Sequence, residues 1–484
     1  SRSGENGGNE MTPRIMIAGT ASGSGKTTIV CALLQAFVNR GLKTAAFKCG
    51  PDYIDPMFHS QIIGTKSCNL DGYFMDRETI NKLMFKNARG MDIAVIEGVM
   101  GYYDGLGMED TASSYALARD TQTPVILVVP CKGIGRSVQA VVDGYIGFKE
   151  NPHIKGVIFN QLAPSLYPSM KEYCAQKNIR ALGCFPRVEE AEIKSRHLGL
   201  VTADEIADLK EKMQILAEAA EQHMDLVGIL ELARTAEKSA DFVPFGHMAP
   251  GAAQEETGES DKKSLRIAVA KDRAFCFYYE DNLTLLQELG CEIVPFSPLA
   301  DRTLPKDIDG MILGGGYPEL YVRALEQNHD MRRAVRAEIA NGIPTYAECG
   351  GFLYLHRELT APDGTKGEMA GVFDGACVFT QKLQHFGYVE LEALKDNLLC
   401  QKGGRIRAHE FHRCVSDLCA DTFRVMKGGR EWTGFISADN VLAGFPHLHY
   451  YANPQFAQSF VEKCAEYHNK RGKLAVCMDT RQLR

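Results

Sequence analysis

The sequence predicts an α/β fold made of two doubly wound domains. The chain has 484 residues, which is too long for one ordinary hydrophobic core. Short apolar runs rich in β-branched residues alternate with helical stretches in the first half, and the alternation restarts in the second half. Between the halves, residues 239–264 are rich in Pro, Gly, Ser and charge, a composition typical of a linker.

In the first half, the apolar runs predict buried strands of a parallel sheet at residues 14–19, 44–49, 92–98, 124–130 and 155–162. A helix is expected after the first run, because Ile29, Leu33 and Phe37 recur every four residues and Gly41 is a natural stop. Strands joined through helices in this way are typical of a doubly wound sheet.

In the second half, strands are expected at residues 266–270, 291–296, 310–316 and 344–349. The resulting division is a disordered tail at 1–10, a first domain at 11–238, the linker at 239–264, a second domain at 265–470 and a C-terminal tail at 471–484.

Composition excludes several classes of function. The formal net charge of −7 argues against a general binder of nucleic acid or of a membrane surface. The 15 cysteines are scattered singly, which disfavours zinc knuckles and a disulfide framework and favours a reducing cytoplasm. No apolar run reaches the length of a membrane span.

Residues 19–28, "GTASGSGKTT", follow a predicted strand and open a predicted helix, which is the context of a phosphate-binding loop. Glycines let backbone N–H groups converge on phosphate oxygens at the helix N-terminus. Lys26 would reach the outer phosphates of ATP, and the Thr27 hydroxyl would bind Mg²⁺. A plain glycine turn is the alternative reading. The loop residues expected to contact ATP are Thr20, Gly23, Ser24, Gly25, Lys26, Thr27 and Thr28.

Acidic and basic residues follow the next predicted strands, where substrates of doubly wound sheets bind. Residues 47–59 contain Lys48, Asp52 and Asp55, and residues 96–105 contain Glu97 and Asp104. Strand-end acids can hold Mg²⁺ or orient a substrate, although an Asx turn or a helix cap explains them as well. Arg196 and His197 are further candidate cations for an acidic ligand, and a plain surface pair is the alternative.

In the second half, "YAECGGFLYL" at 346–355 places Cys349 between a predicted strand and a predicted helix. A nucleophile on such an elbow is exposed, and the helix dipole is expected to lower the pKa of its thiol. Backbone N–H groups of Gly315, Gly316 and Gly350 are candidates for an oxyanion hole. His447 and His449 are both candidates for a general base, and a core position is the alternative for each. The "HEFH" stretch at 409–412 is only a weak zinc signal.

The chain resembles the cobyrinate a,c-diamide synthase family, glutamine-dependent amide ligases of corrinoid biosynthesis. The stretches that carry the resemblance are "GTASGSGKTT", "KCGPDYIDP", "IEGVMGYYDG", "RHLGL", "AFCFYYEDNL", "GGGYPEL", "ECGGFLYL", "HEFH" and "HLHYYANP". The resemblance implies an N-terminal P-loop NTPase domain similar to dethiobiotin synthetase and a C-terminal class I glutaminase domain.

The same resemblance implies roles for individual residues. Cys349 would form a glutamyl thioester and His447 would activate it, and no acidic third member is expected beside His447. Thr27 and Glu97 would hold Mg²⁺, and Asn160 would meet the adenine of ATP. The residues implied for positioning the substrate carboxylates are Lys48, Asp52, Asp55 and Asp104.

The implied partners are a corrinoid or other tetrapyrrole polycarboxylate, L-glutamine and ATP, with no nucleic acid and no membrane; a homodimer stays open. Two rival substrates, nickel-sirohydrochlorin and hydrogenobyrinate, are amidated by related enzymes with the same motifs. A more distant rival is a partitioning-type ATPase switch that carries a non-catalytic glutaminase-like module.

Overall fold

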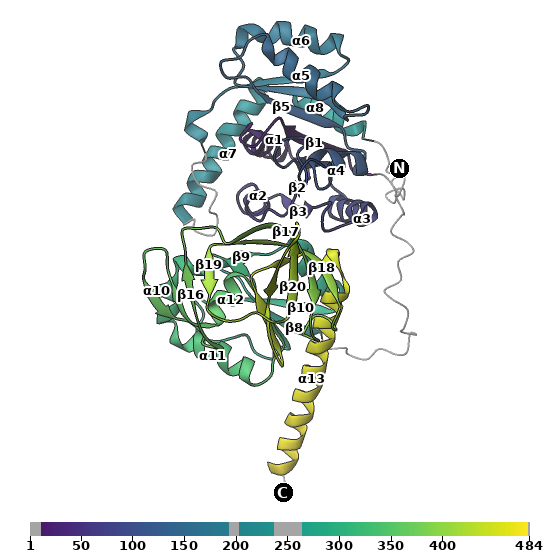
Figure 1. Cartoon of the computed structure of the whole chain (residues 1–484). Coiled ribbons are helices and arrows are strands. Elements are labelled where there is room, and N and C mark those ends of the chain that lie inside the picture. Colours follow the sequence, from purple (N-terminus) through teal and green to yellow (C-terminus); the bar gives the residue numbers. More distant parts are fainter. Residues whose placement is uncertain (1–10, 193–202, 237–263, 483–484) are drawn as a thin grey trace, which may run out of the picture. The chain divides into compact units, whose positions relative to one another are not determined.

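The computed structural model describes residues 11–192, 203–236 and 264–482, and the chain divides into two compact units between Thr257 and Gly258. This division falls inside the predicted linker. The predicted tail at 1–10, the linker up to residue 263, and Arg196 and His197 lie outside the described residues. Each unit is built on its own central sheet (Figure 1).

The first unit has a seven-stranded, all-parallel sheet in the order β3-β2-β4-β1-β5-β6-β7. All five strands predicted from its apolar runs are present. Two strands, β3 and β7, were not predicted. The bounds are β1 Arg14–Gly19, β2 Thr44–Cys49, β3 Lys66–Leu70, β4 Ile93–Glu97, β5 Val125–Pro130, β6 Ile154–Asn160 and β7 Arg180–Phe185.

Helices cover this sheet. Among the described helices of this unit, α1 and α7 pack against each other most extensively. The predicted periodicity of α1 is confirmed, since Ile29, Leu33 and Phe37 are fully buried and Gly41 ends the helix with φ +77°. The bounds are α1 Lys26–Asn39, α2 Ile54–Phe58, α3 Arg77–Ala88, α4 Ser114–Thr121, α5 Ser137–Gly147, α6 Tyr167–Gln176, α7 Ala203–His223 and α8 Leu226–Arg234.

The second unit has a six-stranded sheet in the order β10-β8-β11-β13-β23-β22, parallel except for β22. The predicted run 310–316 divides into two strands, and the second of them, β12, pairs with β9 outside this sheet. The bounds are β8 Leu265–Ala270, β9 Phe275–Phe277, β10 Cys291–Phe296, β11 Gly310–Leu313, β12 Gly315–Gly316, β13 Thr345–Glu348, β22 Ile436–Ala438 and β23 Val441–Gly444.

Two further sheets of the second unit were not predicted from the sequence. They have the orders β15-β14-β16-β19 and β21-β20-β17-β18-β24, and the second is antiparallel throughout. Their bounds are β14 His356–Thr360, β15 Lys366–Glu368, β16 Phe373–Phe379, β17 His385–Ala393, β18 Arg405–His412, β19 Cys414–Ser416, β20 Phe423–Lys427, β21 Arg430–Gly434 and β24 His447–Leu448.

The helices of the second unit are α9 Glu280–Glu288, α10 Val322–Gln327, α11 His329–Ala340, α12 Gly350–Leu355 and α13 Gln455–Gln482. The predicted boundary between a domain ending at 470 and a tail is not seen, because α13 continues through it (Figure 1). Arg471 lies beyond that boundary and still donates to Asp309 over 2.9 Å. Arg471 is therefore part of the packed second unit.

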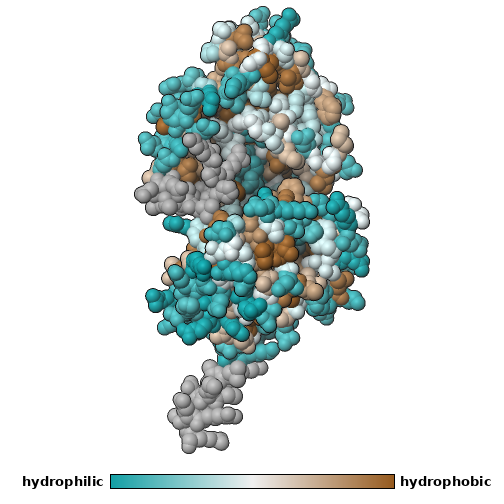
Figure 2. Space-filling model, turned by 60° about the vertical axis from the view of Figure 1, so that its left-hand side comes forward, coloured by the Kyte–Doolittle hydropathy of each residue, from teal (hydrophilic) through white to brown (hydrophobic). Residues whose placement is uncertain are grey.

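The surface carries polar residues over most of the face shown in Figure 2, with apolar residues in separate patches. Across the described ranges, no helix combines the length and the apolar character needed to span a bilayer.

Candidate functional site

The phosphate loop connects β1 to α1 and is tightly folded. Gly25 is the residue before α1 and has a left-handed φ of +97°, which favours glycine. A Cβ on Gly25 would lie 2.3 Å from Nδ2 of Asn160, and a Cβ on Gly19 would lie 2.0 Å from Oγ of Ser24. Asn160, at the end of β6, donates to the carbonyl of Ser24 over 3.0 Å. The structure therefore brings Asn160 to the loop, where it binds the loop backbone, and its contact with the adenine of ATP stays a prediction.

Lys26 and Thr27 open α1 and reach toward the end of β4. The Lys26 ammonium donates to the carbonyls of Ala21 (2.9 Å) and Met100 (2.6 Å), which places it inside the loop. The Thr27 hydroxyl donates to Oε1 of Glu97 over 2.7 Å. Because β1 and β4 are parallel neighbours, their carboxyl ends bring this hydroxyl and this carboxylate to one point.

The other loop residues lie around this core. Gly23 is exposed, with φ +77°, and Thr28 is half-buried in the first turn of α1. The carbonyl of Thr20 accepts a hydrogen bond of 2.6 Å from the Tyr145 hydroxyl.

Lys48 is the centre of a buried cluster of charges behind the loop. Its ammonium lies 2.8 Å from Asp55, 3.1 Å from Glu97 and 3.9 Å from Asp52. Burial opposes the charge of Lys48, but the carboxylates, Glu97 first, raise its pKa overall. Burial and the charge of Glu97 raise the pKa of Asp55 to about 7. The cluster therefore carries more carboxylates than amines.

Sequence reasoning missed His59, which follows α2 in a turn of π-helix and is fully buried. Its Nε2 lies 3.4 Å from Oε2 of Glu97, and its Nδ1 lies 3.3 Å from the Ser67 hydroxyl. Burial alone would raise the pKa of Glu97, but Lys48 and His59 lower it below its usual range. No motif around His59 indicates this role.

The two remaining predicted acids differ in their placement. Asp52 lies near Lys48. It also forms an Asx turn, since its Oδ1 accepts from the Ile54 N–H over 2.7 Å. Asp104 is exposed and accepts from the Gly101 N–H over 2.8 Å. Gly101 itself lies against the phosphate loop, because a Cβ on it would be 2.9 Å from the Thr20 carbonyl oxygen. Asp104, which binds Gly101, therefore lies at the rim of the phosphate loop.

In the second unit, Cys349 stands between β13 and α12 with φ +47° and ψ −98°. This is the strained strand-to-helix elbow that the sequence predicts. Two glycines make it sterically feasible. A Cβ on Gly350 would lie 3.0 Å from the Gly316 nitrogen, and one on Gly351 would lie 1.9 Å from the Leu313 carbonyl oxygen.

The predicted oxyanion residues and the predicted base meet beside this elbow. Gly350 packs against Gly316, and a Cβ on Gly315 would lie 2.8 Å from Cε1 of His447. Gly315 and Gly316 form β12, which pairs with β9. The structure thus gathers the elbow, the glycine strand and the His447 ring in one place.

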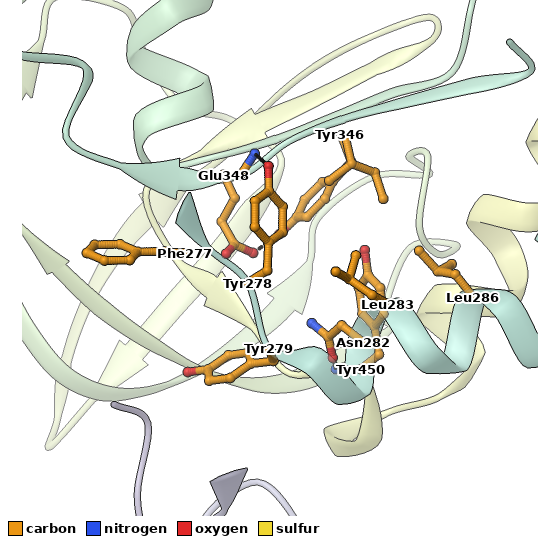
Figure 3. A pocket seen from close by; sticks show the side chains of 11 residues that line it. Phe277, Tyr278, Tyr279, Asn282, Leu283, Leu286, Tyr346, Glu348 and Tyr450 are labelled. Carbon is orange, nitrogen blue, oxygen red and sulfur yellow. Dashed lines mark hydrogen bonds between the residues drawn. The ribbon is translucent and has the colours of Figure 1, made fainter. Parts of the chain in front are cut away.

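An acidic partner for His447 exists, contrary to the sequence analysis. Oε1 of Glu348 lies 2.9 Å from Nδ1 of His447, and both side chains are buried. Oε2 of Glu348 accepts from the Tyr346 hydroxyl (2.7 Å) and from the Leu448 N–H (3.0 Å), and Figure 3 shows Tyr346 and Glu348 facing each other. The acid was missed because it precedes the cysteine instead of following the histidine.

Of the two readings given for His449, general base or core residue, the structure favours the core residue. It is fully buried, packs on the Tyr279 ring at 4.8 Å, and its Nδ1 accepts from the Tyr451 N–H. In the "HEFH" stretch, His412 pairs with Glu410 at 3.0 Å and stacks on Phe445. Within the part of the chain that the structure describes, no three His, Cys, Asp or Glu side chains are grouped to hold a metal ion.

The predicted lowering of the Cys349 pKa is wrong. Burial raises this pKa well above its ordinary value, and the nearby carboxyl groups of Glu319, Glu348 and Glu410 add to the effect. The helix that follows, α12, has only six residues, so its dipole is weak. The thiol therefore keeps its proton until a base removes it.

Comparison with known proteins assigns both units. Residues 15–201 match the CobQ/CobB/MinD/ParA nucleotide binding domain, and residues 266–455 match the CobB/CobQ-like glutamine amidotransferase domain. A cobyrinate a,c-diamide synthase of Listeria innocua is 39% identical over 451 residues, which cover 91% of this chain and 97% of that protein. One of Thermoplasma volcanium is 38% identical over 466 residues, covering 95% and 99%.

The chain belongs to the cobyrinate a,c-diamide synthase family. The predicted fold class is confirmed, with a P-loop nucleotide-binding domain followed by a glutamine amidotransferase domain. The prediction of a glutamine-hydrolysing carbon–nitrogen ligase is confirmed as well.

The buried His449 predicts an acid-sensitive second unit. Burial lowers its pKa to about 3, whereas in the unfolded chain a histidine titrates near 6.5. Above pH 6.5 the contribution of His449 to stability is fully present. As the pH falls from about 6.5 toward 3, only the unfolded state takes up the proton, and stability drops by about 1.4 kcal/mol per pH unit. We expect His449→Gln to remove this part of the slope.

The measurement is the urea midpoint of the unaltered chain and of His449→Gln at pH 7, 6, 5 and 4. His223→Gln, a change at an exposed histidine of α7, is the control and should keep the slope of the unaltered chain. Equal slopes for His449→Gln and the unaltered chain would contradict the assignment of His449 to the core.

Proposed function

We propose that this enzyme amidates the a- and c-acetate carboxylates of cobyrinate with ammonia released from glutamine, at the expense of ATP. The relatives that match over more than nine-tenths of this chain carry the name cobyrinate a,c-diamide synthase. The observation that carries the proposal is the buried His447–Glu348 pair beside the Cys349 elbow, in a chain that also holds the Thr27–Glu97 contact behind a phosphate loop.

The ligase half has to make a carboxylate oxygen into a leaving group. We propose that a carboxylate oxygen attacks the γ-phosphorus of ATP, which forms an acyl phosphate and releases ADP. Such a transfer needs positioning and charge stabilisation, and no protein nucleophile. Lys26 and the N–H groups of residues 23–28 would hold the phosphates, because the Lys26 ammonium lies inside the loop and these residues lead into the N-terminus of α1.

The residues behind the loop fit a magnesium ion. Thr27 and Glu97 supply the oxygen ligands that Mg²⁺ prefers, and buried Oε2 of Glu97 has no hydrogen-bond donor among the described residues, only the ion-pair contact with His59. When bound there, Mg²⁺ would neutralise charge on the phosphates. Lys48 and Asp55 adjoin these ligands and, with Asp52 and Asp104 at the rim, would orient the substrate carboxylate.

The glutaminase half would release ammonia through a thioester. His447 takes the thiol proton of Cys349, and the thiolate attacks the side-chain carbonyl carbon of glutamine. We propose that the N–H groups of Gly316 and Gly350 donate to the negative oxygen, and Gly315 lies against the His447 ring. Collapse expels ammonia, which carries away the proton held by His447, and water then hydrolyses the thioester to glutamate.

Ammonia then attacks the acyl phosphate at its carbonyl carbon and displaces phosphate, which leaves the amide. The same sequence on a second acetate gives the a,c-diamide. Glu348 keeps the Nδ1 proton of His447 in place, so that Nε2 is the nitrogen that accepts the thiol proton.

The substrate is tested by incubating the unaltered chain with Mg²⁺, ATP and glutamine and with one of three tetrapyrroles. We expect diamide formation from cobyrinic acid to have a kcat/KM at least about tenfold above that from nickel-sirohydrochlorin or hydrogenobyrinic acid, because a mismatched macrocycle loses more than about 1.4 kcal/mol of transition-state binding. A preference for either of the other two would contradict the proposed substrate.

Cys349→Ser separates the two halves. We expect the loss of glutamate release and of glutamine-dependent amidation, because a serine hydroxyl beside His447 is a far poorer nucleophile than the thiolate. Amidation with ammonium chloride at pH 8.5 should stay within about twofold of the unaltered chain. Loss of both activities would contradict the division of labour between the units.

Glu348→Gln tests the orienting carboxylate. The amide can donate to Nδ1 and thereby favour the wrong tautomer of His447, so we expect the kcat of glutamate release to fall by at least about tenfold. Amidation with ammonium chloride should be unaffected. Tyr346→Phe removes only one of the three hydrogen bonds to Glu348 and should cost less. An unchanged kcat in Glu348→Gln would show that His447 needs no acidic partner.

A further inference from the structure

Residues 274–283, "AFCFYYEDNL", form β9 and the first turn of α9, and no step of the proposed reaction uses them. They lie against both strands that carry the glutaminase groups. Their contacts therefore bear on how the oxyanion residues and the base are held.

The first contact is with the glycine strand. Phe277 pairs with Gly315 and Phe275 pairs with Gly316, in antiparallel register. A Cβ on Gly316 would lie 2.1 Å from the Ala274 carbonyl oxygen. The backbone of residues 274–277 thus covers the glycine strand along its whole length.

Tyr278 ends this contact with its hydroxyl. The hydroxyl accepts from the Gly314 N–H over 2.8 Å and donates to the Ala270 carbonyl, so it joins the ends of β8 and β11. A Cβ on Gly314 would lie 2.4 Å from Cζ of Tyr278, which shows how closely the ring covers this residue. Gly314 directly precedes the two glycines proposed for the oxyanion hole, so Tyr278 fixes where they begin.

Asn282 makes the corresponding contact with the base. Its Nδ2 donates to the Leu448 carbonyl and its Oδ1 accepts from the Tyr450 N–H, each over 2.8 Å. Leu448 directly follows His447 and also donates its own N–H to Glu348. The amide of Asn282 therefore holds the backbone directly after His447, the proposed base, through hydrogen bonds to Leu448 and Tyr450.

Tyr278 and Asn282 also line a small cavity of about 20 Å³, together with Glu348 and Tyr346 (Figure 3). This is room for about one water molecule. Little free space remains beside the two side chains, and the two contacts constrain the same region.

We propose that Tyr278 and Asn282 are positioning residues for glutamine hydrolysis, which hold the oxyanion strand and the His447 strand in fixed relation. The proposal rests on the proposed function of the Cys349 site. Neither side chain touches glutamine in this scheme. Each acts through backbone, Tyr278 through Gly314 and Asn282 through Leu448.

The test compares Tyr278→Phe and Asn282→Ala in the full chain, with glutamate release from L-glutamine as the assay. We expect kcat to fall about tenfold in each variant while the glutamine KM stays within about twofold, because the oxyanion and base geometry matter mainly in the transition state. L-glutamate γ-semialdehyde forms a hemithioacetal with the thiol and mimics that state. Its inhibition constant should rise about tenfold in Tyr278→Phe.

Asn440→Ala is the matched control. Asn440 also makes two hydrogen bonds to backbone in this unit, to the carbonyls of Ile339 (2.9 Å) and Ile343 (2.7 Å), but these lie at the end of α11 and just after it. It should leave the kcat of glutamate release within about twofold. Thermal unfolding midpoints and amidation with ammonium chloride report on the fold of every variant.

An unchanged kcat in both Tyr278→Phe and Asn282→Ala would overturn the proposal. So would a parallel loss of ammonia-dependent amidation, because the stretch would then support the fold as a whole. The assay of glutamate release does not depend on which tetrapyrrole carboxylate the enzyme amidates. A chain that hydrolyses glutamine but amidates no tetrapyrrole would therefore refute the proposed substrate and leave this test intact.

Discussion

The geometry of the glutaminase site depends on one buried carboxylate, that of Glu348. Its two oxygens bind Nδ1 of His447, the Leu448 N–H and the Tyr346 hydroxyl. Glu348 ends β13 in the parallel sheet, whereas His447 and Leu448 form β24 at the edge of the antiparallel sheet. A buried charge is costly unless it is hydrogen-bonded, so this carboxylate and its three hydrogen bonds link the two sheets beside Cys349.

The first unit also contains a buried cluster of charges, in which carboxylates outnumber amines. Lys48 is the one ammonium within reach of Glu97, Asp55 and Asp52 among the described residues, and His59 adds only a fifth group on the far side of Glu97. Three carboxylates around one amine leave the cluster short of positive charge, and burial together with the charge of Glu97 raises the pKa of Asp55 to about 7. A site with this deficit favours a cation, so the buried network is itself an argument for a metal ion behind the phosphate loop.

Much of this architecture follows from sequence patterns that have a direct physical cause. Apolar runs give the buried parallel strands, and the glycines of "GSGKTT" and "ECGG" mark backbone that must turn or pack closely. Strands β3 and β7 were missed because "KSCNL" and "RALGCF" contain few β-branched residues. The antiparallel sheets were missed because β17 and β18 are half-polar, with alternate residues exposed.

The contacts between side chains were predicted less well than the strands, helices and turns of the backbone. Glu348 and His447 are 99 residues apart, and their pairing depends on how β13 and β24 are placed, which local pattern does not encode. His59 is found beside Glu97 for the same reason, since a π-helical turn after α2 carries it there. The pKa of Cys349 was predicted with the wrong sign because the local pattern does not encode the burial of the thiol, which raises this pKa most. The carboxyl groups of Glu319 and Glu410, which come from distant segments, add to the effect of the adjacent Glu348.

The raised pKa of Cys349 changes what the site must accomplish. A thiolate held ready by a helix dipole would react wherever glutamine arrived, with little demand on its neighbours. In the proposed mechanism, a protonated thiol reacts when His447 removes its proton and the oxyanion hole receives the developing charge at the same time. Reactivity then depends on the relative placement of β12, β13 and β24. In such a site, we expect side chains that only hold backbone, such as Tyr278 and Asn282, to influence the rate of glutamine hydrolysis.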